Sequence, residues 1–171
     1  MELFQDKDGK RTNLPSQNID TGMGLERITR VLQEKETVYH TDLLAPIVLA
    51  AGDATADIYK NQDKEKIYFS DRNLRIISDH IRAATFLAAD GVTPSNLGRG
   101  YVMRRIIRRA VRSGYLLQNN KRAFTEPVIE SVVKNYQKAY PELKEKIAEI
   151  KTIITQEELN FLETLQHGLK L

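Results

Sequence analysis

The segment from Arg99 to Arg112 constrains the fold of this chain most, because it predicts a helix with two opposite faces. Six of its fourteen residues are arginines: Arg99, Arg104, Arg105, Arg108, Arg109 and Arg112. At about 100° per residue, the five arginines after Gly100 share an arc of roughly 140°. The opposite half of the helix is apolar: Val102, Met103, Ile106, Ile107, Ala110 and Val111. The sequence therefore predicts a helix that buries an apolar back in a core and turns an arginine face outward.

The arginine face has few acidic neighbours in the sequence. From residue 72 to residue 122 the chain carries eleven arginines and lysines against two aspartates, Asp79 and Asp90, whereas the whole chain has a net charge of only +3. A charged helix face is more often solvated and paired with nearby acids, and we expect some of these arginines to be buried in ion pairs, with Arg105 and Arg109 nearest the apolar boundary. The local excess of positive charge nevertheless favours an extended anionic partner, such as a phosphate backbone.

Apolar residues recur at helical spacing through most of the chain, which predicts a mainly α fold. We expect a helical bundle of about six helices, preceded by a short irregular N-terminal segment. One helix is expected to be capped by Asp71 after a short extended piece at 67–69, and the arginine helix is expected to end at Gly114. A helix over 124–138 and a long last helix with Pro141 in its first turn complete the bundle.

Composition argues against several classes of protein. The chain has no cysteine, and its histidines (His40, His80 and His167) are far apart, so neither disulfides nor a metal site is expected. No apolar run approaches the ~20 residues of a membrane span, and the first residues lack the pattern of a signal peptide. We therefore expect a cytoplasmic, monomeric chain with no membrane partner.

Two segments with glycines precede predicted helices and are candidate ligand sites. The segment Asp20-Thr-Gly-Met-Gly-Leu-Glu-Arg27 leads into a helix, where backbone N–H groups can approach a phosphate, although paired glycines also form ordinary tight turns. The segment from Asp90 to Gly100 is dense in turn residues and leads into the arginine helix. Asn96 in this loop carries both a donor and an acceptor, which suits the reading of a base edge, but asparagine also often closes a turn.

Together these two segments resemble a known family. Asp20-Thr-Gly-Met-Gly-Leu-Glu-Arg27 looks like motif 3 of the class II aminoacyl-tRNA synthetases, in its alanyl form. The stretch from Asp79 to Asn96, continued from Gly98 to Arg112, resembles the helical tRNA-recognition region of alanyl-tRNA synthetases. The resemblance covers nearly the whole chain and is most specific in this second stretch.

The resemblance implies roles for individual residues. Arg27 matches the arginine that contacts ATP, and Gly24 lets the backbone approach the nucleotide. Asp20 matches the aspartate that receives the amino group of alanine, and Gly22 keeps that pocket small. Asn96 matches the asparagine that helps to read a G·U wobble pair near the end of the tRNA acceptor stem. The expected tRNA-binding set therefore joins this asparagine to the arginines: Asn96, Arg99, Arg104, Arg105, Arg108, Arg109 and Arg112.

The implied function is that of part of an alanine–tRNA ligase, with residues 1–40 ending the catalytic domain and residues 41–171 forming the helical tRNA-recognition domain. The full enzyme would use ATP and Mg²⁺, with alanine and alanine tRNA as its other partners. It would bind the tRNA through the acceptor stem. Motifs 1 and 2 and the zinc ligands of the full enzyme would lie outside this chain. We therefore expect no complete catalytic site, no bound cofactor and no activity from this fragment alone.

The alternative is a non-enzymatic helical module that binds nucleic acid in general or another protein. A self-contained enzyme is disfavoured, because the sequence offers no nucleophile with a base and no set of metal ligands. Binding to an acceptor minihelix, compared between G·U and G·C at the wobble position, separates the first two interpretations.

Overall fold

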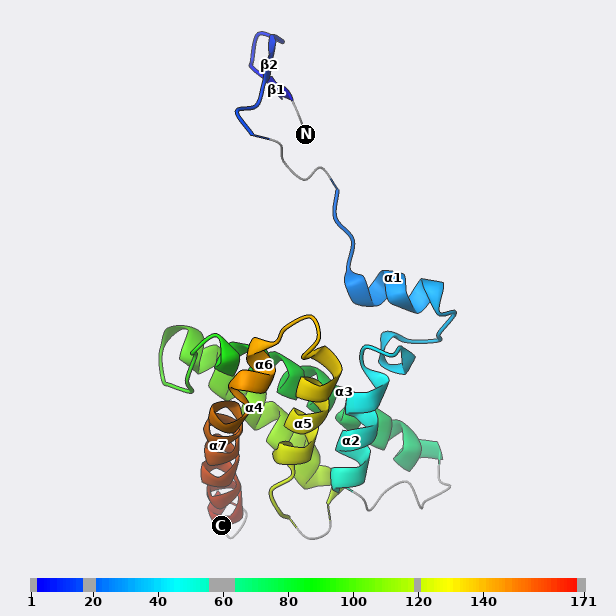
Figure 1. Ribbon diagram of the computed structural model, residues 1–171. Coiled ribbons are helices and arrows are strands. Elements are labelled where there is room, and N and C mark those ends of the chain that lie inside the picture. The colour runs from blue at the N-terminus through cyan, green and yellow to red at the C-terminus, as the bar shows by residue number, and fades with distance from the viewer. Residues whose placement is uncertain (1–2, 17–20, 56–63, 119–120, 169–171) are drawn as a thin grey trace.

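The structure, a computed structural model, describes residues 3–16, 21–55, 64–118 and 121–168, and gives only the backbone for residues 64–70. Within these ranges it contains seven α-helices, one short 3-10 helix and a two-stranded hairpin. Six helices pack into a bundle, α1 leans on its edge, and the hairpin lies apart at the N-terminal end (Figure 1). The prediction of a mainly α bundle with a short N-terminal segment is confirmed, with one more helix than expected.

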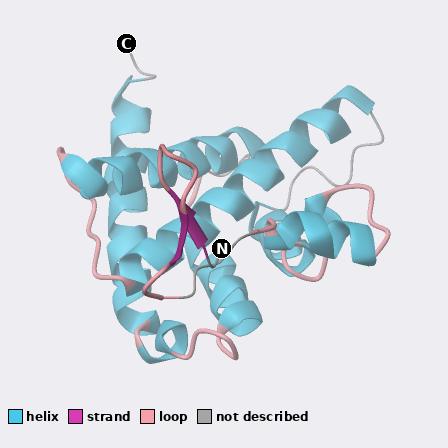
Figure 2. Cartoon of the chain, turned by 90° about the horizontal axis from the view of Figure 1, so that it is seen from above, coloured by secondary structure: helices cyan, strands magenta, loops and turns pink. Residues whose placement is uncertain are grey.

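The elements follow one another along the chain as β1 (Leu3–Gln5), β2 (Arg11–Asn13), α1 (Leu25–Leu32), η1 (Val38–His40), α2 (Ala45–Thr55), α3 (Lys64–Ala89), α4 (Gly98–Leu117), α5 (Thr125–Tyr136), α6 (Glu142–Glu145) and α7 (Ile147–Gly168). Strands β1 and β2 are antiparallel, with Phe4 opposite Thr12. Seen from above, the hairpin overlaps the bundle (Figure 2), because it is displaced along the vertical direction of Figure 1.

The arginine helix α4 forms an antiparallel pair with α3, and this pair makes the most extensive helix–helix contact in the described chain. Helix α3 ends in a Schellman motif, in which Val92 N–H donates to Leu87 O (2.9 Å) and Gly91, at φ +78°, donates to Ala88 O (2.9 Å). A glycine is favoured at this position because a side chain is strained at positive φ. The motif turns the chain back and places the loop from residue 90 to residue 97 directly before α4.

The core lies between α3 and α4 on one side and α2, α5 and α7 on the other. On α4 the apolar back behaves as predicted: Met103, Ile107, Ala110 and Val111 are fully buried. Val102 departs from this pattern, being 54% exposed near the start of the helix, and Ile106 is half-buried. Other fully buried members of the core come from the surrounding helices: Ile47, Ala51, Ile77, Ile81, Ala84, Val128, Ile129, Val132, Leu143, Ile150 and Ile154.

Three expected boundaries were wrong. Helix α3 already begins at Lys64, so residues 67–69 are helical rather than extended, and Asp71 lies inside the helix, where it pairs with Arg75 at i+4 (Nε–Oδ1 3.0 Å). Helix α4 continues past Gly114 to Leu117. The expected long last helix is divided into α6 and α7, which meet at Lys146. In each case the helix boundary depends on tertiary contacts or on helix extension that local sequence rules do not predict.

The residue at position 114, inside α4, is a glycine because the ring of Phe124 packs against the backbone there. A Cβ at Gly114 would lie 2.1 Å from Cε1 of Phe124, which is far inside van der Waals contact. The glycine therefore serves a close approach between α4 and the start of α5, not the end of a helix.

Helix α5 receives its N-terminal cap from α7. Its own N-cap residue, Phe124, makes no side-chain capping bond. Instead, the buried carboxylate of Glu158 accepts hydrogen bonds from Phe124 N–H (2.8 Å), Thr125 N–H (3.2 Å) and the Thr125 hydroxyl (2.5 Å). Burial raises the pKa of Glu158, against the opposing effect of these hydrogen bonds. The cap fixes α5 and α7 relative to each other, because three donors on one helix end share one carboxylate on the other helix.

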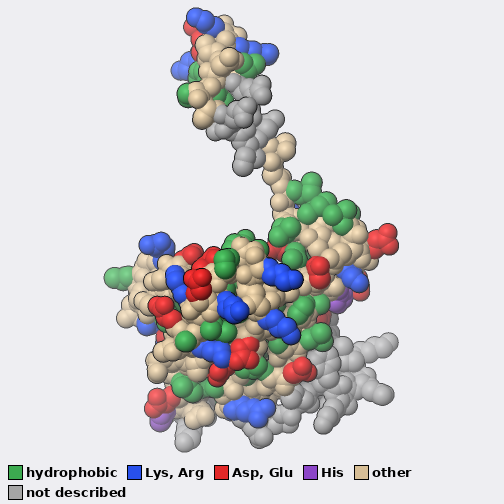
Figure 3. Space-filling model, in the orientation of Figure 1, with side chains coloured by type: hydrophobic (Ala, Val, Ile, Leu, Met, Phe, Trp, Pro, Cys, Tyr) green, Lys and Arg blue, Asp and Glu red, His purple; other side chains and the backbone are tan. Residues whose placement is uncertain are grey.

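Helix α1 is held to the bundle by charge and leaves its apolar face uncovered. Glu26 lies 2.8 Å from Arg82 of α3, whose guanidinium also reaches Asp79 (3.2 Å) and the Tyr136 hydroxyl (3.2 Å). None of the residues of α1 is buried, and Val31 is 62% exposed. Figure 3 shows hydrophobic side chains gathered over this helix. No helix in the described part of the chain combines the length and apolar character needed to cross a membrane.

Candidate nucleic-acid interface

The arginines of α4 form two rows that have different surroundings. Arg104 and Arg108, four residues apart, face α7 and are half-buried. Arg105, Arg109 and Arg112 follow one another at helical spacing and are exposed. We call the first pair the inner row and the second set the outer row. The predicted arginine face is therefore real, but only part of it is open to a ligand.

Both arginines of the inner row pair with Glu157, a residue that interrupts the apolar stripe of α7. Its side chain is only 6% exposed; Oε1 lies 2.7 Å from Arg108 Nε, and Oε2 lies 3.5 Å from Arg104 Nε. The guanidinium of Arg108 also lies over the ring of Phe161, 5.1 Å from its centre. We had expected Arg105 and Arg109 to be the paired arginines, but among the described residues neither has an ion-pair partner. The direction from which α7 approaches decides which row is paired.

Arg104 connects the inner row to the loop before α4. One terminal guanidinium nitrogen donates a hydrogen bond to the side-chain oxygen of Asn96, and the other donates to Pro94 O (3.4 Å). Asn96 itself is exposed. A chain of contacts thus runs from buried Glu157 through Arg104 to Asn96, and it orients the amide of Asn96 on the surface.

The same loop is pressed onto the first turn of α4. A Cβ at Gly100 would lie 2.3 Å from Ser95 Oγ and 2.4 Å from Thr93 O, so only glycine permits this contact. Ser95 Oγ in turn donates to Leu97 O (2.9 Å). Arg99 is exposed beside this loop. Asn96 and Arg99 therefore lie at the start of α4, where Asn96 contacts Arg104 of the inner row.

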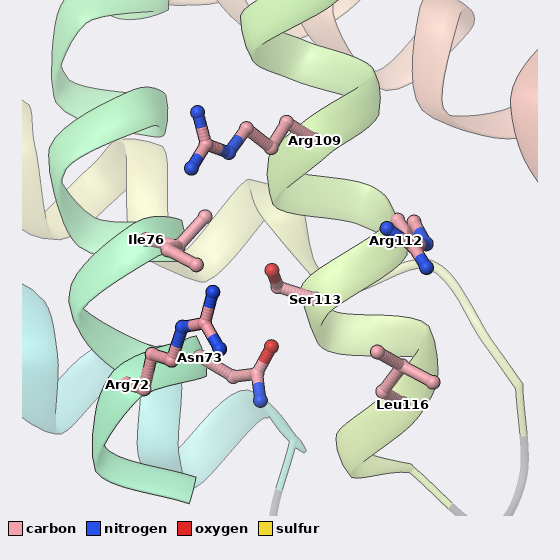
Figure 4. A pocket seen from close by; sticks show the side chains of 7 residues that line it. All are labelled: Arg72, Asn73, Ile76, Arg109, Arg112, Ser113 and Leu116. Atoms are coloured by element: carbon pink, nitrogen blue, oxygen red, sulfur yellow. The ribbon is translucent and has the colours of Figure 1, made fainter. Parts of the chain in front are cut away.

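Arg109 and Arg112 of the outer row border a cleft between α4 and α3. Figure 4 shows Arg72 and Arg109 extending into the gap from the two helices, with the Ser113 side chain between them. Arg112 also lines this cleft. Deeper along α3, burial lowers the pKa of His80, and the positive charge of Arg109 lowers it further. His80 lies 4.0 Å from Asp79, whose carboxylate also pairs with Arg82.

The whole chain, residues 1–171, matches the family described as tRNA synthetases class II (A). This chain belongs to the class II tRNA synthetases. Among its relatives, the alanine–tRNA ligase of Synechococcus elongatus is 48% identical over 172 residues, which cover 100% of this chain and 19% of the relative. The corresponding ligase of Fervidobacterium nodosum is 44% identical over 170 residues, covering 99% and 19%. That of Burkholderia vietnamiensis is 43% identical over 173 residues, covering 100% and 18%. The chain thus spans about a fifth of the length of these relatives.

In this synthetase chain, the residues expected to bind ATP and alanine lie in and before α1. Gly24 is the N-cap residue of α1, and Arg27 is exposed on its first turn. Gly22 is exposed as well, and a Cβ there would meet nothing within 4 Å. Asp20 lies outside the described residues. Figure 1 shows α1 on the opposite side of the bundle from the loop before α4, so the structure does not bring α1 and Asn96 together.

Sequence reasoning missed three side chains around the arginines of α4. Glu157 interrupts an apolar stripe and was assigned no role from the sequence, yet it pairs with both arginines of the inner row. Arg72 on α3 and Ser113 on α4 line the cleft with the outer row. Glu157 could have been found, because a lone acid in an apolar stripe needs a cationic partner. In the described residues, no group of three or more histidines and acids is placed to hold a metal ion.

Proposed function

We propose that this chain is the part of an alanine–tRNA ligase that binds the acceptor stem of alanine tRNA. The observation that carries the proposal is the arrangement of α4, whose outer row of exposed arginines has no ion pair among the described residues. The helix follows a loop whose Asn96 is oriented by Arg104. Phosphate contacts by the arginines position the duplex, and the asparagine reads a base edge. The relatives that share this region are named as alanine–tRNA ligases.

The two rows of arginines have different roles in this proposal. The outer row, Arg105, Arg109 and Arg112, together with Arg99, contacts phosphates directly. Arg104 and Arg108 are held by Glu157 and act mainly by positioning the loop and α7. Asn96 approaches the minor groove, which in A-form RNA is wide and shallow enough for a short side chain on a loop.

The second element of the proposal is the segment around α1. Residues 1–40 form the end of the catalytic domain, and residues 41–171 form the tRNA-recognition domain. Gly24 and Arg27 contribute to an ATP site, and Asp20 and Gly22 to an alanine site, in the whole ligase, which uses ATP with Mg²⁺. The exposure of Arg27 and of the apolar face of α1 fits a site whose other wall comes from elsewhere in the protein. The ion pair between Glu26 and Arg82 joins the two parts.

A binding experiment with the chain itself tests this function. RNA hairpins that copy an acceptor stem, one with G·U and one with G·C at the wobble position, are titrated at several salt concentrations. We expect salt-dependent binding of both hairpins and tighter binding of the G·U hairpin. Equal binding of any duplex would instead support the general nucleic-acid module, and absence of binding would support a protein-interaction module.

A further inference from the structure

We propose that the cleft between α3 and α4 is a phosphate-binding site, in which Arg72 and Arg109 together hold one phosphodiester group of the RNA backbone. The inference rests on the proposed function, because it takes the phosphate to be part of bound RNA. It adds a residue of α3 to the interface and assigns two arginines to one shared phosphate.

The lining of the cleft has the composition expected of an anion site. The cavity measures about 320 Å³ and is lined by Arg72, Asn73, Ile76, Arg109, Arg112, Ser113 and Leu116. Arg72, Arg109 and Arg112 therefore line one space, and none of the described residues in its walls is acidic. A phosphate group with several waters fits a volume of this size, since water occupies about 30 Å³ in the liquid.

The neighbouring cavity provides an internal comparison. Arg72, Ile76 and Arg109 also line a second hollow further along the two helices, of about 350 Å³. That second hollow contains Asp71 and Asp79, which pair with Arg75 and Arg82 respectively. Its positive charge is therefore largely compensated, whereas that of the first cleft is not. An anion that approaches the two helices is drawn to the first cleft.

The arginines of the cleft are available for a ligand. Within the described residues, Arg72, Arg109 and Arg112 have no ion pair and no side-chain hydrogen bond, and all three are exposed. Their neighbours on α4, Arg104 and Arg108, show by contrast how a carboxylate occupies such a group. Each guanidinium offers a planar fork of donors that matches two phosphate oxygens. The hydroxyl of Ser113, which projects into the same space (Figure 4), can donate a further hydrogen bond.

The first test compares variants of the cleft with a matched control. Arg72→Gln and Arg109→Gln each remove one positive charge, and Lys134→Gln removes the charge of an exposed lysine on α5. We expect each cleft variant to weaken the binding of an RNA hairpin about tenfold at low salt, and to lower the salt slope by somewhat less than one unit. Lys134→Gln should leave both quantities close to those of the parent. Equal losses in all three variants would mean that binding follows net charge, and would overturn the site.

The second test asks whether the two arginines share one phosphate. If they do, Arg72→Gln and Arg109→Gln combined will cost less affinity than the product of the two separate losses. Purely multiplicative losses would overturn the shared site. Thermal unfolding is followed in parallel; if Arg109→Gln lowers the melting temperature, Arg109→Lys, which keeps the charge but not the fork, replaces it and should still lose RNA affinity.

The third test separates this inference from the proposed function and identifies the source of the phosphate. Inorganic phosphate is compared with chloride at equal ionic strength for its effect on the melting temperature of the parent and of Arg109→Gln. We expect the parent to bind RNA tightly. In competition, high phosphate should displace RNA from the parent, which has Arg109, but not from Arg109→Gln. If the cleft variants bind RNA as tightly as the parent, the inference is overturned and the proposed function is left intact. If the parent does not bind RNA, both the proposed function and this inference are overturned. This holds even if phosphate raises the melting temperature of the parent, since the cleft would then bind a free anion.

Discussion

Arg104 donates a hydrogen bond to the side-chain oxygen of Asn96, eight residues earlier in the chain. The same guanidinium lies 3.5 Å from Glu157 of α7, whose side chain is almost completely buried. The bond fixes the amide of Asn96 so that its nitrogen points away from Arg104, and it leaves the second lone pair of the oxygen for another donor. The orientation of Asn96, which lies on an exposed loop, is thus fixed through Arg104 by the buried side chain of Glu157.

We predict that Asn96→Ala, made in a whole ligase, reduces the preference for G·U over G·C stems by about 1–3 kcal/mol, the usual value of one good base contact. Arg104→Lys should reduce the same preference by less, because it keeps the charge but loses the fork that holds Asn96. Aminoacylation rates of the two tRNA variants measure the preference. Arg99→Ala is the control, expected to weaken both stems alike. An unchanged preference in Asn96→Ala would remove this residue from recognition.

We predict that Arg108→Ala lowers the free energy of unfolding by about 1–3 kcal/mol, because it leaves the buried Glu157 with only the longer contact to Arg104. Arg112→Ala, on the exposed outer row, should change stability by no more than about 0.5 kcal/mol. Denaturant unfolding measures both values. Similar effects of the two substitutions would show that the inner and outer rows do not differ in structural role.

We predict that ionisation of Glu158 opposes folding. Since burial raises the pKa of Glu158 above the ordinary 4.5, the folded chain holds this proton more tightly than the unfolded chain. The corresponding stability is fully present below the unfolded pKa and is lost as the pH rises through the folded pKa. The unfolding free energy of the parent, taken relative to Glu158→Gln, should therefore fall as the pH increases from about 4.5. A difference that stays constant, or rises, between acid and neutral pH would contradict the raised pKa.

We predict that Gly114→Ala is destabilising by about 1–3 kcal/mol, although alanine is the better helix former. The reason is the Phe124 ring, whose Cε1 atom lies 2.1 Å from the position of the new Cβ. Gly168→Ala, at the end of α7 where a Cβ meets nothing within 4 Å, is the matched control and should be neutral or slightly stabilising. Thermal unfolding of both variants checks the prediction. A Gly114→Ala chain as stable as the parent would mean that the ring moves at no cost.

We predict that this chain alone forms no alanyl-adenylate. Arg27 and Gly24 are exposed, and the sequence contains nothing similar to motifs 1 and 2, so ATP and alanine would lack a complementary wall. Exchange of pyrophosphate into ATP in the presence of alanine is the assay, with an intact alanine–tRNA ligase as the positive control. Alanine-dependent exchange above background would contradict the prediction.

The sequence alone determined the helices and their buried faces wherever side-chain periodicity was long. The apolar positions Met103, Ile107 and Ala110 repeat at helical spacing, and burial of such a stripe is favourable in any arrangement of the bundle. The motifs at Asp20–Arg27 and around Asn96 likewise identified the family, because they are local patterns. The roles assigned to their residues remain predictions.

The tertiary structure alone decided which arginines are paired and where the helices end. Arg104 and Arg105 are adjacent and chemically identical, but only Arg104 faces Glu157, since α7 packs on that side of α4. Gly114 has the local signature of a helix end, yet the ring of Phe124 requires it within the helix. Such outcomes depend on contacts between residues far apart in sequence, and the free energy of those contacts exceeds the small local preferences that sequence patterns express.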